Sequence, residues 1–234
     1  MRTETQKINE FDAYCAFPDK GATRGAVIVI QEILGVNDNI KSLCHWLAGE
    51  GYIAIAPDMF WRLERNIALA GVNEEEWQKA FELMNRFDLD VGIDDIQAAI
   101  NYARNLEGGH GRAPQKVATM GFCLGGRCAY YAACRTDGDA HISYYGVGIE
   151  SAIEEATQIK APTILHLACD DQFVPPAAQA AIHKGLAHNP HIDIYDYSGC
   201  DHAFARAGGD SYDEPAASAA HKRTLDLLSK TLSV

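Results

Sequence analysis

The sequence predicts an α/β fold, a doubly wound and mostly parallel sheet flanked by helices, in one domain over residues 1–234 without a large lid. Three observations predict it. A length of 234 residues suits one domain. Apolar runs typical of buried strands alternate with segments of helical spacing. One of these runs also enters a helix directly through a glycine-rich turn.

The predicted strands are short apolar or alternating runs bounded by polar or glycine-containing segments. Residues 24–32 form a continuous apolar run that is typical of a strand buried on both faces, so we expect a central parallel strand there. In chain order, the predicted strands are Thr3–Ile8, Phe11–Pro18, Arg24–Glu32, Tyr52–Asp58, Lys116–Cys123, His141–Val147, Thr163–Ala168 and Ile192–Tyr197.

Helical spacing and end signals predict the helices. Asn37 or Asp38 can cap the first one, and Pro175 is typical of a helix start. A polar segment at 60–88 is expected over the edge or mouth of the sheet, and a glycine-rich turn is expected at 108–111. The predicted helical segments are Asn37 or Asp38 to about Gly49, Glu74–Arg86, Val91 to about Leu106, the small-residue stretch after Cys123, a stretch near Ile153, Pro175 to about Ala187, and about Ala216 to Leu232.

Composition excludes several classes of function. A formal net charge of -12 repels phosphate backbones and anionic lipids, so we expect no nucleic-acid partner. The first ten residues form no apolar signal core, and no run approaches the ~18 apolar residues of a membrane span, so we expect a cytoplasmic protein. Seven cysteines without a CxxC pair argue against a disulfide framework or zinc ribbon. We expect no metal or cofactor, and a monomer or small homo-oligomer.

The segment Gly121-Phe-Cys123-Leu-Gly125 is a G-x-C-x-G motif between a strand and a helix, the cysteine form of the nucleophile elbow of α/β-hydrolases. The flanking glycines let strand and helix pass closely. The helix N-terminus favours a thiolate and a developing oxyanion, and the amide of Leu124 is one expected oxyanion donor. An isolated cysteine at a turn usually only packs, but this context favours catalysis by Cys123. Cys128 and Cys134, on the following helix, are expected to pack.

The order nucleophile, acid, histidine, each on a loop after a later strand, selects the partners of Cys123. Asp171 follows the strand that ends at Ala168, and Asp170 is its neighbouring competitor. His202 follows the strand that ends at Tyr197. A lone histidine is usually without catalytic function, but its place in this order favours His202 as the base.

The chain resembles the dienelactone hydrolase family, the carboxymethylenebutenolidases, almost from end to end. The segments that carry the resemblance are Gln31–Asn37, Gly51-Tyr52 with Ala56–Asp58, Gly121–Gly126, Tyr144–Gly148, Asp171–Pro175 and His202–Arg206. The resemblance implies a triad of Cys123, Asp171 and His202, an oxyanion hole from the amides of Ile33 and Leu124, and Arg206 as a binder of a substrate carboxylate. It also implies that Glu32, beside the thiol, is a further catalytic residue that accepts the thiol proton when substrate binds. A second carboxylate-binding arginine of that family corresponds here to Trp77, with Lys79 and Arg86 nearby.

Some of these residues also have simpler interpretations. Without the resemblance, Glu32 is equally well a solvent-facing strand-end carboxylate, and Arg206 an ordinary surface cation. Tyr144 and Tyr145 are expected to be core or pocket aromatics, and we count Tyr144 and Trp77 among the substrate-binding candidates.

The expected activity is hydrolysis of a small, anionic ester or lactone through an acyl-cysteine, with dienelactone-like ring opening as the implied reaction. Two alternatives stay open at this point. One is a carboxylesterase or thioesterase with another substrate, and the other is a non-catalytic thiol sensor or binding protein on the same fold.

Overall fold

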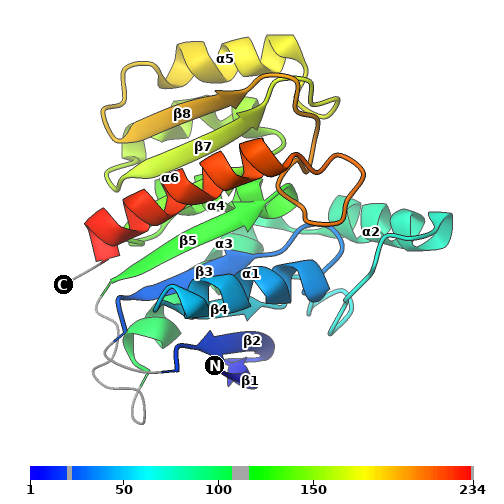
Figure 1. The fold of residues 1–234 in the computed structure, drawn as a ribbon, viewed down its shortest axis with the longest axis vertical. Helices are drawn as coiled ribbons and strands as arrows, with labels where there is room; N and C mark the ends of the chain where they lie inside the picture. Colours follow the sequence, from blue (N-terminus) through cyan, green and yellow to red (C-terminus); the bar gives the residue numbers. More distant parts are fainter. Residues whose placement is uncertain (20–22, 107–115, 233–234) are drawn as a thin grey trace.

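The computed structural model describes residues 1–19, 23–106 and 116–232. The named strands form one eight-stranded sheet in the order β1-β2-β4-β3-β5-β6-β7-β8 (Figure 1). The strands are β1 Arg2–Ile8, β2 Phe11–Phe17, β3 Ala26–Ile30, β4 Ile53–Pro57, β5 Val117–Phe122, β6 Ala140–Tyr144, β7 Thr163–Ala168 and β8 Ile192–Tyr197. The predicted fold class, that of an α/β-hydrolase, is confirmed.

Parallel pairing joins the strands from β4 to β8, whereas β1 and β2 form an antiparallel hairpin at one edge. The central strands β3, β4, β5 and β6 are buried along their whole length. Helices on both faces of a parallel sheet produce this burial, because each crossover places a helix over the strands. The continuous apolar run at 24–32 therefore contains the central strand that it predicts.

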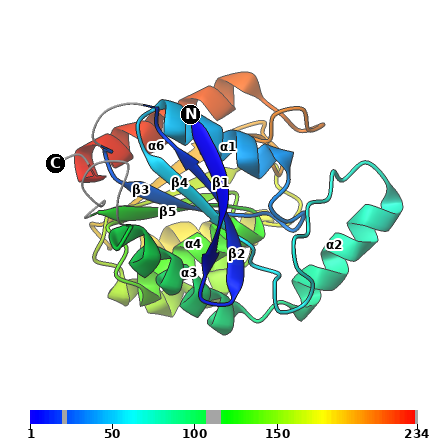
Figure 2. The same cartoon turned by 90° about the horizontal axis from the view of Figure 1, so that it is seen from below.

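Helices cover both faces of the sheet (Figure 2). On one side lie α1 and α6, and on the other lie α3 and α4, with the 3₁₀ segment η1 packed on α4 and with α5 packed on η1. The helical segments are α1 Asp38–Gly49, α2 Glu74–Arg86, α3 Leu89–Arg104, α4 Leu124–Arg135, η1 Ile149–Gln158, α5 Pro176–Leu186 and α6 Glu214–Leu232. None of the described helices has the length and apolar character that crossing a membrane requires.

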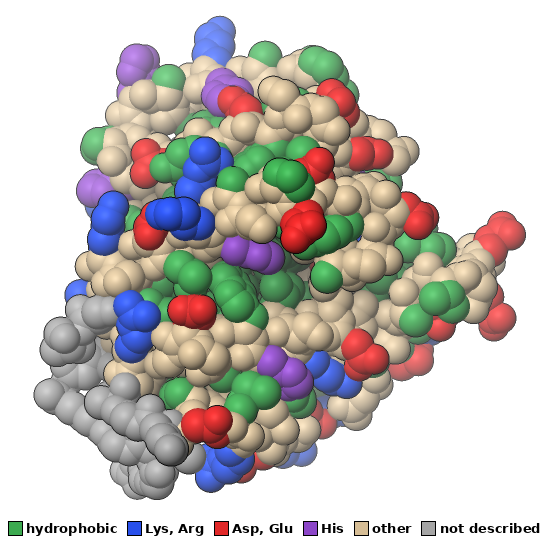
Figure 3. All heavy atoms as spheres, in the orientation of Figure 1, with side chains coloured by type: hydrophobic (Ala, Val, Ile, Leu, Met, Phe, Trp, Pro, Cys, Tyr) green, Lys and Arg blue, Asp and Glu red, His purple; other side chains and the backbone are tan. Residues whose placement is uncertain are grey.

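Helix α2 projects from the body of the molecule beside the carboxyl ends of the strands (Figures 1 and 2). Its first turn contains Glu74, Glu75 and Glu76, and its buried residues are Ala80 and Leu83. Figure 3 shows acidic side chains over the visible face, including this projecting part, as the net charge of -12 leads one to expect. The polar segment at 60–88 thus lies at the mouth of the sheet, as predicted.

Most predicted boundaries agree with the structure, and two differences have local causes. Helix α3 begins at Leu89, two residues before the predicted Val91, because the Asp88 side chain accepts from the amides of Asp90 and Val91 as its N-cap. Strand β6 ends at Tyr144 rather than Val147, because Tyr145 has φ +38°, which no strand residue adopts. The predicted turn at 108–111 lies outside the described residues.

Candidate active site

The nucleophile candidate Cys123 is the N-cap residue of α4 and directly follows β5. Its backbone has φ +56° and ψ -115°, a conformation that a non-glycine residue adopts only under strain. The surrounding glycines make this turn possible. A Cβ at Gly121 would lie 1.9 Å from the carbonyl oxygen of Gly125, and one at Gly125 would lie 2.3 Å from that of Ile30. The predicted close passage of strand and helix is therefore confirmed.

The structure brings Asp171 and His202 together from the loops after β7 and β8. Nδ1 of His202 and Oδ2 of Asp171 are 2.7 Å apart. The other carboxylate oxygen of Asp171 accepts a 2.8 Å hydrogen bond from the amide of Phe173, which fixes the carboxylate. Asp171 is buried, whereas the competitor Asp170 is exposed, so the geometry favours Asp171 as the acid.

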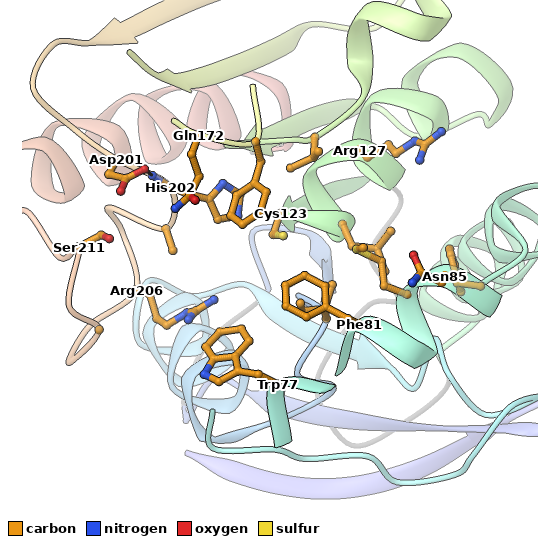
Figure 4. Close-up of a pocket in the computed structure, with 18 of the residues that line it drawn as sticks. Trp77, Phe81, Asn85, Cys123, Arg127, Gln172, Asp201, His202, Arg206 and Ser211 are labelled. Carbon is orange, nitrogen blue, oxygen red and sulfur yellow. Dashed lines mark hydrogen bonds between the residues drawn. The ribbon is translucent and has the colours of Figure 1, made fainter. Parts of the chain in front are cut away.

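His202 lies next to Cys123 in the pocket (Figure 4). Burial alone lowers the pKa of His202, but the hydrogen bond with Asp171 and the attraction of Cys123 outweigh burial and raise it to about 10. Nε2 is buried and has no hydrogen-bond partner of ordinary geometry among the described residues. His202 is therefore a cation near neutral pH, with an N–H free to serve a reacting group.

Aromatic rings hold His202 in place. Tyr145 and Phe173 meet its ring edge to face, with ring centroids 5.2 Å and 4.9 Å away. Tyr145 at φ +38° and Ala203 at φ +64° are, like Cys123, in the positive-φ region. Three strained non-glycine residues thus meet at one site, which is typical of functional sites.

Glu32 is fully buried and paired with Arg206, contrary to its interpretation as a solvent-facing carboxylate. Nε of Arg206 donates a 2.9 Å hydrogen bond to Oε2 of Glu32, and the Tyr145 hydroxyl donates to Oε1 over 3.4 Å. Burial and the Glu32 carboxylate raise the pKa of Tyr145 well above its usual range. Cys123 also raises this pKa, whereas the Arg206 guanidinium lowers it. No hydrogen bond joins Glu32 to Cys123 within the described parts of the chain.

The two expected oxyanion donors, the amides of Ile33 and Leu124, both belong to residues that line the pocket around Cys123. Leu124 is the first residue of α4, so its N–H has no partner within the helix. In the described structure no acceptor takes up either N–H group.

The pocket around Cys123 has a volume of about 690 Å³, within the range of small-molecule sites. Trp77 and Arg206 lie next to each other on one side of it (Figure 4), and Cζ of Arg206 lies 5.9 Å from the centre of the Trp77 ring. Trp77 thus lines the pocket as expected. The residues lining it are Ile33, Trp77, Phe81, Met84, Asn85, Phe87, Leu89, Cys123, Leu124, Arg127, Val147, Gln172, Phe173, Asp201, His202, Ala203, Arg206, Gly209, Asp210 and Ser211.

Tyr144 is not in the pocket, so its prediction as a substrate-binding residue is wrong. Its side chain is fully buried, its ring stacks on Phe122 at 4.6 Å, and its hydroxyl lies 2.7 Å from Oγ1 of Thr224. The neighbouring Tyr145 contacts the site instead, because the positive φ at the end of β6 turns the chain there. Cys128 and Cys134 are buried, which confirms their packing role.

Several residues of the pocket were not predicted from the sequence. Phe173 is adjacent to Asp171 in the sequence, so its loop was identified but its contact with His202 was not. Phe81 and Asn85 lie on α2 at helical spacing from Trp77, which could have indicated them. Arg127 lies one helical turn after Cys123 and could have been found in the same way. Among the described residues, no group of three or more His, Cys, Asp or Glu could hold a metal.

Comparison with known proteins identifies the family of the chain. The model of the dienelactone hydrolase family matches residues 11–232. The chain is 39% identical over 214 residues to the "Putative carboxymethylenebutenolidase" of Azospirillum brasilense, covering 92% of this chain and 90% of that protein. It is 34% identical over 233 residues to the carboxymethylenebutenolidase of Pseudomonas putida, covering 97% of each.

A solved structure leads to the same family. The crystal structure of the "Putative Dienelactone Hydrolase" from Klebsiella pneumoniae superposes with a TM-score of 0.84 at 26% identity, covering 98% of both chains. The family match over nearly the whole chain and the relatives above 30% identity decide the assignment. The chain belongs to the dienelactone hydrolase family of carboxylic ester hydrolases.

Proposed function

We propose that this chain is a cytoplasmic thiol hydrolase that opens a small, anionic, dienelactone-like lactone through an acyl-cysteine intermediate. The observation that carries the proposal is the pairing of His202 with Asp171 at 2.7 Å beside Cys123, on a strained elbow in a pocket. The carboxymethylenebutenolidases among its relatives suggest the lactone.

In the acylation step, the thiolate of Cys123 attacks the lactone carbonyl carbon, and a C–S bond forms as the carbonyl electrons move to oxygen. In this proposal, the amides of Ile33 and Leu124, two residues that line the pocket, stabilise the oxyanion. When the tetrahedral adduct collapses, the ring C–O bond breaks, and the departing enolate or alkoxide takes a proton from His202. The raised pKa of His202 supports this role, because the imidazole holds that proton at neutral pH.

In the deacylation step, neutral His202 accepts a proton from water as the water attacks the thioester carbonyl. The C–S bond then breaks, which regenerates the thiolate of Cys123 and the imidazolium and releases a carboxylic acid. Asp171 holds the ring in the tautomer that leaves Nε2 facing the reacting atoms, and it stabilises the cation.

Arg206 is the proposed binder of the substrate carboxylate. Only its Nε is occupied, by Glu32, and none of the described residues accepts a hydrogen bond from its two terminal nitrogens. Burial by itself lowers the pKa of Arg206, but Glu32 outweighs burial and raises it, so the guanidinium is always charged. Trp77 covers one side of the Arg206 guanidinium and stands where the family has a second carboxylate-binding arginine. Arg206 therefore has to bind this carboxylate without that second cation.

The test is a panel of substrates that compares anionic enol lactones with neutral lactones and neutral aryl esters. Wild-type enzyme should have its highest kcat/KM for an anionic lactone. Arg206→Ala should lower kcat/KM for both classes through the uncompensated Glu32, but at least about tenfold more for anionic lactones than for neutral esters, since only the anion uses the cation. Equal losses for both classes would remove Arg206 from carboxylate binding. A preference for neutral esters would make the chain a general carboxylesterase instead.

A further inference from the structure

A second arginine lines the pocket on the far side of the nucleophile from Arg206. Arg127 is on α4, one helical turn after Cys123, and its amide donates to the carbonyl of Cys123 over 3.0 Å. In Figure 4, Arg127 and Arg206 lie on opposite sides of Cys123, and Asn85 of α2 is on the same side as Arg127. A ligand extended across the thiol would therefore meet a cation at each end.

Arg127 has no anionic partner within the described parts of the chain. Its Nε is buried and makes no hydrogen bond to any described residue, and its guanidinium carbon lies 5.7 Å from the centre of the Tyr131 ring. A Cβ at Gly148 would lie 3.4 Å from the guanidinium carbon of Arg127, so the glycine leaves room for this side chain. Arg135, on the same helix, is instead paired with both Asp90 and Glu155. A desolvated guanidinium N–H without an acceptor is unfavourable, and an anionic ligand in the pocket would relieve that cost.

The other charges of the pocket do not compensate Arg127. Glu32 is bound to Arg206 and Tyr145, and the two aspartates that line the pocket, Asp201 and Asp210, come from the loop that carries His202 and Arg206. Asp201 is also occupied, because it accepts a 2.6 Å hydrogen bond from the amide of His202. Figure 4 shows Asp201 on the side of the pocket away from Arg127.

We propose that Arg127 forms a second anion subsite and that the substrate is a dianion with a carboxylate at each end. One carboxylate binds Arg206, the other binds Arg127, and the ester or lactone carbonyl between them lies at Cys123. This inference rests on the proposed hydrolase function and names its substrate class. The pocket volume of about 690 Å³ leaves room for a ligand longer than one lactone ring.

The experiment measures competitive inhibition of para-nitrophenyl acetate hydrolysis by dicarboxylates from succinate to suberate, each compared with the monocarboxylate of equal length. For at least one length, the dicarboxylate should bind wild type at least about tenfold more tightly, as a second charge-assisted contact requires. In Arg127→Gln that advantage should fall to about twofold or less, and Arg127→Lys should retain part of it, because lysine keeps the charge but not the guanidinium fork. If wild type showed no dicarboxylate advantage, or Arg127→Gln kept all of it, the subsite would be refuted.

Arg135→Gln is the matched control, because it removes the same charge from the same helix outside the pocket lining. It should leave the dicarboxylate advantage at its wild-type value, and a loss there equal to that of Arg127→Gln would reduce the effect to general electrostatics and overturn the subsite. Hydrolysis of the aryl ester by wild type but not by Cys123→Ala tests the proposed function separately. If wild type hydrolysed nothing, calorimetric titration of wild type and Arg127→Gln with the same acids would still show whether Arg127 binds the second carboxylate.

Discussion

Nε of Arg206 and Oε2 of Glu32 are 2.9 Å apart in a buried ion pair that joins positions 174 residues apart in the chain. The carboxylate has no exposed surface, and the arginine is largely buried beside the pocket. Removing one partner of such a pair leaves the other charge desolvated and uncompensated. Any change at Arg206 therefore also changes the field that Glu32 exerts on the thiol.

Cys123→Ala should lower kcat by ~10³-fold or more, because the oxyanion donors alone leave only residual catalysis. The fold should survive, since alanine is smaller than cysteine at this turn. Steady-state kinetics and thermal melting check both statements. Cys128→Ala is the matched control on the same helix. Cys128 is buried, which raises its pKa to about 12 and keeps it an inert thiol, so its variant should stay active. Wild-type rates in Cys123→Ala would exclude it as nucleophile.

The neighbouring tyrosines should respond oppositely to loss of their hydroxyl groups. Tyr144→Phe removes a buried 2.7 Å contact with Thr224 and should cost about 1 kcal/mol in the free energy of unfolding, with little change in kcat/KM. Tyr145→Phe removes a donor from Glu32 and should mainly reduce kcat/KM. Urea unfolding and kinetics on the two variants separate these effects. A kinetic defect in Tyr144→Phe at unchanged stability would restore it as a substrate-binding residue.

The His202 pKa of about 10 lies above its usual value of 6.5, so protonation of His202 favours the folded state. This stabilisation is fully present below about pH 6.5 and is lost as the pH rises through about 10, at ~1.4 kcal/mol per unit of separation. The gap in free energy of unfolding between wild type and His202→Gln should therefore narrow over that range. In Asp171→Asn, titration followed by NMR should show a lower His202 pKa. A gap that widened with rising pH would contradict the assignment.

Local patterns predicted the parts of the site that lie at strand ends. The elbow around Cys123 and the loops with Asp171 and His202 follow directly from where β5, β7 and β8 stop, because parallel strands bring their carboxyl ends to one edge. The choice between Tyr144 and Tyr145 could not be made this way. It depends on one backbone angle at Tyr145, and alternation along a strand says nothing beyond the residue where the strand ends.

Long-range pairs were also beyond local reasoning. The resemblance implied roles for Glu32 and Arg206 separately, but no spacing indicates that they bind each other. The sequence of α4 does single out Arg127, because it is the one cation among small and aromatic residues in the first turns of that helix. Whether Arg127 faces the pocket could not be predicted, because the sequence does not show which face of α4 the pocket leaves open.

The ion pair between Glu32 and Arg206 should set the reactivity of Cys123 in the resting enzyme. A buried carboxylate in the same cluster opposes thiolate formation, and Arg206 offsets much of its charge. Glu32→Gln removes the opposing charge and leaves Arg206 in place, so iodoacetamide should alkylate Cys123 several-fold faster than in wild type at pH 7.

Arg206→Met leaves Glu32 uncompensated and should slow alkylation by a similar factor. The double variant should lie near wild type, because both opposing charges are gone. Mass spectrometry of the labelled protein, performed in the Cys128→Ala background, measures each rate at Cys123. Unchanged or slower alkylation in Glu32→Gln would exclude electrostatic control of the thiol by this pair, and a double variant alkylated as fast as Glu32→Gln alone would show that the charge of Arg206 does not itself act on the thiol.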